Sequence, residues 1–371
     1  MNISFVSTIL NFPWGGADTL WTNAAERAAA RGDRLFLAVS ATVAQHPRIR
    51  ALESAGAVIF VQQPAEPPHT LPARLTRKLR AVLRRPDALL QALDGFRPDL
   101  VLFSFGGTYD AILTPTWYDG LAARRIPYRL IANWQVEHPR LAPAELTDIK
   151  RIFAAADRLY FVSQRNLSVT REHLGQPLAH AEVVQNPLRW KPEDATPWPE
   201  VNGLSLAAVA RLEAVKGLQI LLPALAGALP PEGWRLQIYG QGPDEAALRR
   251  QVQALGLDSR VIFRGYVGSL REIWIDNHLL VSPALEEGVP MTIPEAMLCG
   301  RAVLATAVGG AADWVVDGKT GYLCPAPSGP ALATTLETAW SRRDRWRELG
   351  QAGAARARLC YRPDDCRLLI G

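Results

Sequence analysis

The sequence has few residues of the kinds that bind metals or form disulfides. Its six histidines are scattered and Asp-x-Asp does not occur, so we expect neither a required divalent metal nor a cofactor. The four cysteines form no CxxC pair and stand at no zinc-ligand spacing from a histidine: Cys299, Cys324, Cys360 and Cys366. We expect them to be reduced thiols, because free cysteine usually behaves as a small buried hydrophobic residue.

Several catalytic motifs and membrane signals are also missing. The sequence contains no GxSxG elbow and no GxxxxGK[ST] loop, which argues against a hydrolase triad and a P-loop NTPase. No apolar run approaches the ~18 residues of a spanning helix, and the start, MNISFVSTILNFPWGG, has no positively charged leader. These absences favour a soluble, cytoplasmic protein.

The chain is long enough for two hydrophobic cores. It has 371 residues, 48% of them hydrophobic, and single cores usually stop growing near about 250 to 300 residues. Short apolar runs alternate with helical patterns, which favours parallel sheets covered by helices. The expected strands cover 3–7, 35–39, 58–61, 100–105, 129–132, 159–162, 204–209, 235–239, 261–263 and 279–281. Expected helices include 18–31, 217–229, 243–255 and 290–299.

A proline-rich segment divides these elements into two groups. Residues 186–203 hold four prolines and show neither a helical nor a strand period, which is typical of a linker. We therefore expect an α/β fold with two Rossmann-like domains. The expected boundaries are an N-terminal acceptor-side domain at 1–190, a linker at 191–203, a C-terminal donor domain at 204–345 and a C-terminal helix at 346–371 that returns to the first domain.

An acidic loop follows the expected strand 279–281. It contains Glu287, the turn Gly288, Val289 and Pro290, and then the start of a helix with Met291, Thr292 and Glu295. Open α/β sheets bind ligands at the carboxyl ends of their strands, and the first amides of a helix favour anions. Glu295 is placed to accept hydrogen bonds from a vicinal diol such as ribose, although it could instead only complement the helix dipole.

Two cations and a glycine turn follow neighbouring strands. Arg211 and Lys216 come after 204–209, and fixed cations there could stabilise a departing diphosphate. An exposed loop pair is the alternative. After 235–239, Gly240 could let the backbone approach a ligand, although glycines at such places often serve the turn alone. In the first domain, Gly15 and Gly16 follow the first strand without the full GxGxxG spacing, which disfavours dinucleotide binding.

The segment 71–93 predicts a basic amphipathic helix. Between Leu71 and Arg85 it carries six Lys and Arg and no acid. Such a helix can lie on an anionic membrane surface, or it can pack its leucines on the sheet as an ordinary surface helix. Nucleic acid is disfavoured, since no aromatics accompany the charge. The net charge of +5 fits a polyanionic partner, an anionic membrane or a phosphate-bearing substrate alike.

These motifs, in this order, resemble those of the retaining glycosyltransferases of family four, the group 1 type with the GT-B fold. The resemblance is strongest over residues 210–325 and includes ARLEAVKG, YGQGP, VIFRGYV, EGVPMTIPEAMLCG and GGAADWVVDGKTGYL. In the first domain it depends on WGG and FVSQRN. The implied fold has two Rossmann-like domains whose parallel sheets face each other across a cleft.

The resemblance also implies roles for the candidate residues. Glu287 would contact donor-sugar hydroxyls and Glu295 the ribose, while Arg211 and Lys216 hold the diphosphate. The amides of Met291 and Thr292 would meet the phosphate, the backbone around Tyr266 and Val267 would flank the base, and Gly16 would approach the diphosphate from the opposite domain.

The sequence departs from the family pattern in the first domain. After the strand 129–132, where many relatives place a histidine near the reacting sugar, Asn133 or Gln135 would occupy that site and His138 is displaced. In the second domain Asp313 stands where such proteins often carry glutamate, and Asn186-Pro187 replaces the frequent Asn-Gly before the linker.

The expected reaction is a metal-independent transfer of a sugar, with retention, from a nucleoside-diphosphate sugar to a hydroxyl of a glycan or a lipid-linked acceptor. The nucleotide sugar would be a co-substrate, and the setting would be polysaccharide, lipopolysaccharide or glycolipid synthesis at the inner face of the membrane. Two alternatives stay open. One is a sugar-nucleotide epimerase or hydrolase on the same fold, and the other is a catalytically silent subunit that binds the nucleotide sugar.

Overall fold

The computed structural model describes residues 1–10, 14–62, 87–134 and 141–371. Most of the basic segment 71–93 lies outside the described residues, as do Gln135 and His138. Among the described residues, no helix has the length and apolar character needed to cross a bilayer.

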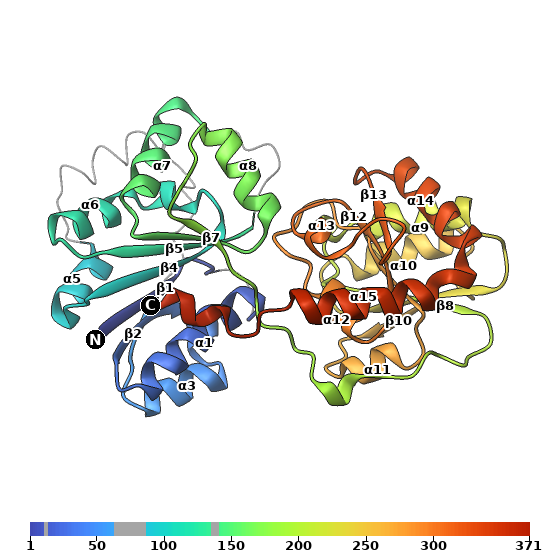
Figure 1. Ribbon diagram of the computed structural model, residues 1–371, viewed down its shortest axis with the longest axis horizontal. Coiled ribbons are helices and arrows are strands. Elements are labelled where there is room, and N and C mark those ends of the chain that lie inside the picture. The colour runs from blue at the N-terminus through green and yellow to red at the C-terminus, as the bar shows by residue number, and fades with distance from the viewer. Residues whose placement is uncertain (11–13, 63–86, 135–140) are drawn as a thin grey trace.

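The first domain is built on a seven-stranded parallel sheet with the order β3-β2-β1-β4-β5-β6-β7 (Figure 1). Its strands are β1 (Asn2–Ser7), β2 (Arg34–Ser40), β3 (Val58–Gln62), β4 (Leu100–Gly107), β5 (Tyr128–Trp134), β6 (Arg158–Phe161) and β7 (Ala181–Val183). The described helices are α1 (Gly16–Ala30), α2 (Ala41–Ala44), α3 (Pro47–Ser54), α5 (Ala88–Phe96), α6 (Pro115–Ala123), α7 (Pro143–Ala155) and α8 (Gln164–Leu174).

The second domain repeats this plan with a six-stranded parallel sheet in the order β10-β9-β8-β11-β12-β13. Its strands are β8 (Leu204–Val209), β9 (Trp234–Tyr239), β10 (Val261–Gly265), β11 (Leu279–Ser282), β12 (Ala302–Thr306) and β13 (Tyr322–Cys324). Its helices are α9 (Leu218–Ala228), α10 (Glu245–Ala254), α11 (Leu270–Trp274), α12 (Thr292–Leu298), α13 (Ala311–Trp314), α14 (Gly329–Ser341) and α15 (Trp346–Cys360). The predicted pair of Rossmann-like domains is confirmed.

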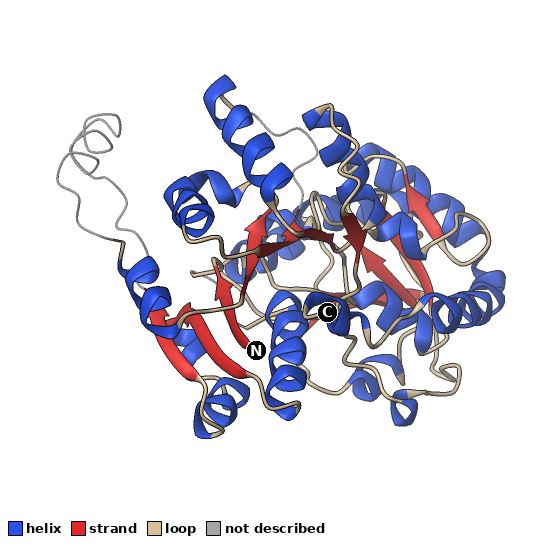
Figure 2. Ribbon diagram, turned by 60° about the vertical axis from the view of Figure 1, so that its left-hand side comes forward, coloured by secondary structure: helices blue, strands red, loops and turns tan. Residues whose placement is uncertain are grey.

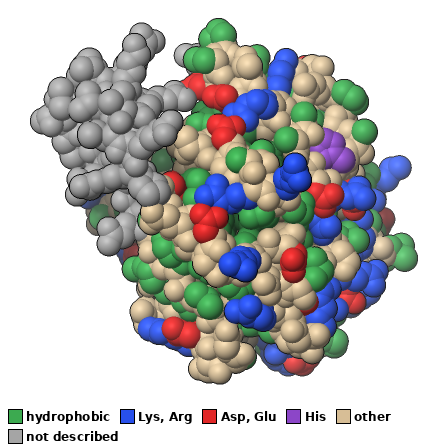
Figure 3. Space-filling view, turned by 90° about the vertical axis from the view of Figure 1, so that its left-hand side faces the viewer, with side chains coloured by type: hydrophobic (Ala, Val, Ile, Leu, Met, Phe, Trp, Pro, Cys, Tyr) green, Lys and Arg blue, Asp and Glu red, His purple; other side chains and the backbone are tan. Residues whose placement is uncertain are grey.

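Both faces of each sheet are buried. Successive side chains of a strand point to opposite faces, and in these strands both sets are mostly apolar. In β2, Leu35 and Leu37 enter the core on one side, with α1, whereas Phe36 and Ala38 enter the core on the other side. Figure 2 shows the strands enclosed between helical layers in both domains. On the face of the first domain in Figure 3, outside the grey atoms, side chains of both charges are interspersed.

The end of the described chain crosses back to the first domain. Helix α15 packs on α12 in the second domain, and the following 3₁₀ turn, Asp365–Leu369, packs on α1 (Figure 1). The Tyr160 hydroxyl donates to the Leu368 carbonyl at 2.6 Å, and Arg129 Nη1 donates to the Leu369 carbonyl at 2.9 Å. The core of the first domain is therefore completed by residues from the far end of the sequence.

We predict that the substitution Leu369→Ala destabilises the first domain by about 2–5 kcal/mol, because it deletes a fully buried side chain from that core. Leu368→Ala is the control, since that side chain is 37% exposed and only its backbone carbonyl is used. Urea unfolding curves of the two variants provide the comparison. Equal losses in both variants would contradict the docking of this turn.

Candidate active site

The carboxyl edges of the two sheets face each other, and the loops there touch. A Cβ built on Gly288, in the loop after β11, would lie 1.8 Å from the carbonyl oxygen of Asn133 at the end of β5. A Cβ on Gly310 would lie 2.9 Å from the Ser163 Cβ, at the N-cap of α8. Any side chain at Gly288 would force the domains apart.

Further contacts join the same two edges. A Cβ on Gly16, at the start of α1, would lie 3.6 Å from Met291 Cγ. Val289 packs against core residues of both domains. The backbone N–H of Gln164 donates to Asp313 Oδ2 at 2.8 Å, and burial raises the pKa of the Asp313 carboxyl. Asp313, which departs from the family pattern, therefore caps a helix of the opposite domain.

Lys216 and Glu287 form an ion pair at this junction, although they are separated by 71 residues in sequence. Their side chains are each 15% exposed. The loops that carry them are joined by a hydrogen bond from Leu285 N–H to the Val215 carbonyl, at 2.8 Å. Gly217 makes this possible, since its φ is +72° and a Cβ there would lie 1.9 Å from the Pro283 carbonyl oxygen.

Arg211 lies on the same loop, with its side chain 40% exposed and its Nη1 atom 2.9 Å from Glu213 Oε1. The glycine turn after β9 supports this loop. A Cβ on Gly240 would lie 1.8 Å from the Ala210 carbonyl oxygen, and Gly240 has a φ of +133°. Backbone packing alone therefore explains why glycine occupies position 240. The contact of Gly240 with a donor stays a prediction.

Glu295 is placed differently from the other candidates. Its carboxylate accepts hydrogen bonds from the Arg189 backbone N–H at 3.2 Å, from Arg189 Nε at 3.1 Å and from Arg189 Nη2 at 2.9 Å. The side chain of Glu295 is only 2% exposed, whereas that of Arg189 is 44% exposed. Arg189 was not predicted as a site residue, because it lies in an aperiodic linker with no motif around it.

The remaining donor-side candidates surround this pair and the start of α12. Tyr266 follows β10 and is 70% exposed, whereas Val267 packs partly buried on the second-domain core. Met291 is the N-cap of α12 and Thr292 its first residue, so their amides have no acceptor within the helix. The Pro290 carbonyl accepts from Ile293 N–H at 3.0 Å and closes the turn before the helix.

The first-domain candidates lie across the junction. Gly15 donates its N–H to Asp18 Oδ2 at 3.0 Å and so fixes the start of α1. Asn133 Nδ2 donates to the Phe105 carbonyl at 2.7 Å and to Ser104 Oγ at 3.0 Å. The buried Oδ1 atom of Asn133 has no hydrogen-bond partner among the described residues. The Asn133 side chain is therefore oriented by β4, and its Oδ1 atom remains able to accept a hydrogen bond.

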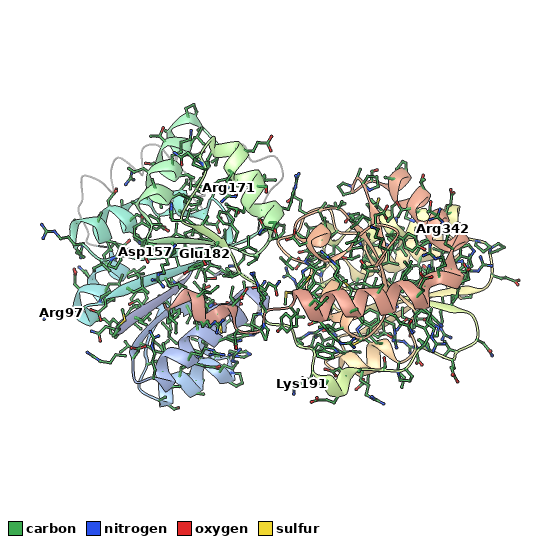
Figure 4. The ribbon with its side chains drawn as sticks, in the orientation of Figure 1. Arg97, Asp157, Arg171, Glu182, Lys191 and Arg342 are labelled. Atoms are coloured by element: carbon green, nitrogen blue, oxygen red, sulfur yellow. The ribbon has the colours of Figure 1, made fainter. Side chains whose placement is uncertain are left out.

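The larger of two cavities among the described residues does not lie at this junction. A cavity of about 40 Å³ lies there, lined by Asn186, Val289, Met291, Pro294 and Asp313 among others, and it is too small for a nucleotide. A depression of about 770 Å³ lies instead on the first domain, lined by Arg129, Arg158, Glu182 and the end of α1. It opens at the amino ends of the strands, where Figure 4 labels Asp157 and Glu182. Ligands of such sheets bind at the opposite edge.

The fold and the junction together define a GT-B protein. Residues 203–342 match the family model for group 1 glycosyl transferases, and the predicted resemblance to the group 1 type is confirmed over these residues. HepE of Anabaena, solved with UDP and, in another structure, with UDP-glucose, has the same fold. The first of these structures matches with a TM-score of 0.75 and 20% identity over 100% of this chain and 98% of HepE.

Two curated relatives extend the comparison. An exopolysaccharide phosphotransferase of Streptomyces coelicolor is 30% identical over 185 residues, which are 49% of this chain and 19% of the relative. The lipopolysaccharide core biosynthesis mannosyltransferase LpcC of Rhizobium leguminosarum is 32% identical over 34% of this chain and 38% of the relative. The chain thus spans less than half the length of these two relatives.

We predict that Gly288→Ala separates the two domains without unfolding either, because the new Cβ would overlap the Asn133 carbonyl. Gly329→Ala is the control, since a Cβ there meets nothing within 4 Å. Small-angle scattering should give a larger radius of gyration for Gly288→Ala alone, with an unchanged circular dichroism spectrum. An unchanged radius would show that the two edges do not meet in solution.

Proposed function

We propose that this protein transfers a glycosyl group from a nucleoside-diphosphate sugar to an acceptor hydroxyl, with retention and without a required divalent metal. The single observation that carries the proposal is the meeting of Lys216 and Glu287 at the carboxyl edge of the second sheet, opposite the first domain. A cation and a carboxylate side by side suit a ligand that joins a phosphate to a polyol.

In this reaction the bond between the anomeric carbon and the diphosphate oxygen breaks, and a bond from that carbon to the acceptor oxygen forms on the same face. The acceptor proton passes to the departing diphosphate, so no side-chain nucleophile is needed. Lys216 and Arg211 would stabilise the negative charge that grows on the diphosphate, with the amides of Met291 and Thr292 at the start of α12. Glu287 would turn from Lys216 to the sugar hydroxyls.

The relative LpcC supports a place in cell-envelope carbohydrate synthesis, and HepE supports a nucleotide-sugar donor. HepE is solved with UDP-glucose, and LpcC is a lipopolysaccharide core mannosyltransferase. Gly288 and Val289, beside Glu287, would then face the sugar, and the Asn133 Oδ1 atom of the first domain would meet it from the other side.

A panel of UDP, GDP and ADP sugars tests the proposal. Thermal shifts should identify one donor that stabilises the protein by mass action, and incubation with that donor should release the nucleoside diphosphate. The glycoside formed should keep the donor's anomeric configuration by proton NMR. Binding without turnover would identify the silent subunit instead, and inversion would contradict the same-face transfer.

We predict that Arg211→Ala lowers kcat by about 100-fold, as is typical for loss of one charge-stabilising donor, while the Kd for the donor changes far less. The reason is that the diphosphate gains charge mainly in the transition state. The control is Arg249→Ala, which removes an exposed helix arginine paired with Glu245. Equal losses in turnover and in donor binding would assign Arg211 to ground-state binding.

We also propose, from charge and spacing alone, that the basic segment 71–93 docks on an anionic membrane surface, which would favour a lipid-linked acceptor. Sedimentation with liposomes should show binding to phosphatidylglycerol vesicles that weakens between low and high salt. Binding to neutral phosphatidylcholine vesicles should be absent. Binding that ignores lipid charge and salt would contradict this proposal.

A further inference from the structure

Arg189 binds the carboxylate of Glu295 with more than a surface contact. Its Nε and Nη2 atoms reach the two carboxylate oxygens separately, at 3.1 Å and 2.9 Å, and its backbone N–H donates a third bond at 3.2 Å. This forked geometry is the strong, directional form of an arginine–carboxylate pair. The pKa of Arg189 is raised, chiefly by its hydrogen bond to Glu295, with Tyr266 contributing as well.

The segment that carries Arg189 is anchored to the crossing between the domains. Leu188 donates its N–H to the Tyr361 hydroxyl at 2.9 Å, just beyond α15. Gln185 donates its N–H to Asp365 Oδ2 at 2.9 Å and its Nε2 to the Cys360 carbonyl at 3.0 Å. The segment before Arg189 is therefore held by the residues at and beyond the end of α15.

The two neighbours of the Arg189 guanidinium suit the two parts of a nucleoside: Tyr266 is aromatic and exposed, whereas Glu295 is acidic and buried. Tyr266 is 70% exposed, and its hydroxyl interacts with the same guanidinium, so a tyrosine, a planar cation and a carboxylate adjoin one another. Aromatic faces stack on bases, and carboxylates accept from hydroxyl pairs. With a side-chain exposure of only 2%, Glu295 cannot receive a ribose unless the guanidinium gives up part of its contact.

We propose that Arg189 is a nucleoside-recognition residue of the donor site: it holds the Glu295 carboxylate, and the ribose diol of the donor takes the place of one of its two side-chain bonds. The inference rests on the proposed function, and it assigns the base and ribose to the side chains of Tyr266, Arg189 and Glu295. The diphosphate end is left to Arg211 and Lys216.

The test separates the nucleoside from the diphosphate. Binding of UDP, GDP and ADP to the wild-type protein is measured by calorimetry, and the tightest is used with R189A, R189K and E295Q. Inorganic pyrophosphate, which lacks ribose and base, is the second probe. K191A is the matched control, because it removes an exposed cation from the same linker, labelled in Figure 4.

R189A should weaken nucleoside-diphosphate binding by about tenfold or more, because the Glu295 carboxylate loses the side-chain bond that keeps it oriented while the ribose occupies the other. Pyrophosphate binding should be unchanged. R189K should lie between R189A and the wild type, because lysine keeps the charge but not the fork. In the E295Q background, R189A should cost clearly less than in the wild type, since the two residues act together.

Two results would overturn the inference while leaving the proposed function intact. The first is a nucleoside-diphosphate Kd for R189A that stays within about twofold of the wild-type value. The second is a loss of pyrophosphate affinity in R189A as large as its loss of nucleoside-diphosphate affinity. Either result would remove the ribose-specific role. Failure of the wild-type protein to bind any of the three nucleotides would overturn the proposed function, and this inference with it.

Discussion

The distance between the carboxyl edges of the two sheets is the constraint on which the site depends. Gly288 lies so close to the Asn133 carbonyl that only a residue without a Cβ fits, and the same applies to Gly310 beside Ser163. These contacts bring Val289 and Met291 of the second domain against the first domain. A ligand bound to the second domain at this edge would therefore be covered by the first.

Charges at this junction are paired across long stretches of sequence. Lys216 binds Glu287, and Arg189 binds Glu295, so neither of these largely buried acids lacks a counter-ion. An unpaired buried charge would be costly. In the proposed reaction each pair exchanges part of its internal contacts for contacts with the donor. The unliganded site is thus stabilised by the same groups that would bind the nucleotide sugar.

Much of this arrangement follows from the sequence. The alternation of buried strands and helices predicts two parallel sheets, and loops at the carboxyl ends of adjacent strands must lie together. This explains why Lys216, after β8, and Glu287, after β11, could be predicted to share a site. The three-residue strands β7 and β13 were missed because so short a run has no detectable period.

Other features could not be predicted because they depend on packing between distant segments. Arg189 reaches Glu295 across 106 residues, from a linker whose pattern gives no sign of a partner. The strand β12 (Ala302–Thr306), which lies between the motifs EGVPMTIPEAMLCG and GGAADWVVDGKTGYL, was also not predicted. Asp313, noted only as a departure from a family pattern, turned out to accept the first amide of α8 from the opposite domain.

A crystal structure of the protein with its nucleoside diphosphate bound would test the central claim most directly. The account predicts density for the diphosphate between Arg211 and Lys216 at the carboxyl edge of the second sheet, with the ribose at Glu295 and the first domain facing it across the junction. Density for the ligand at the amino ends of the strands, in the depression beside Arg129 and Arg158, would contradict it.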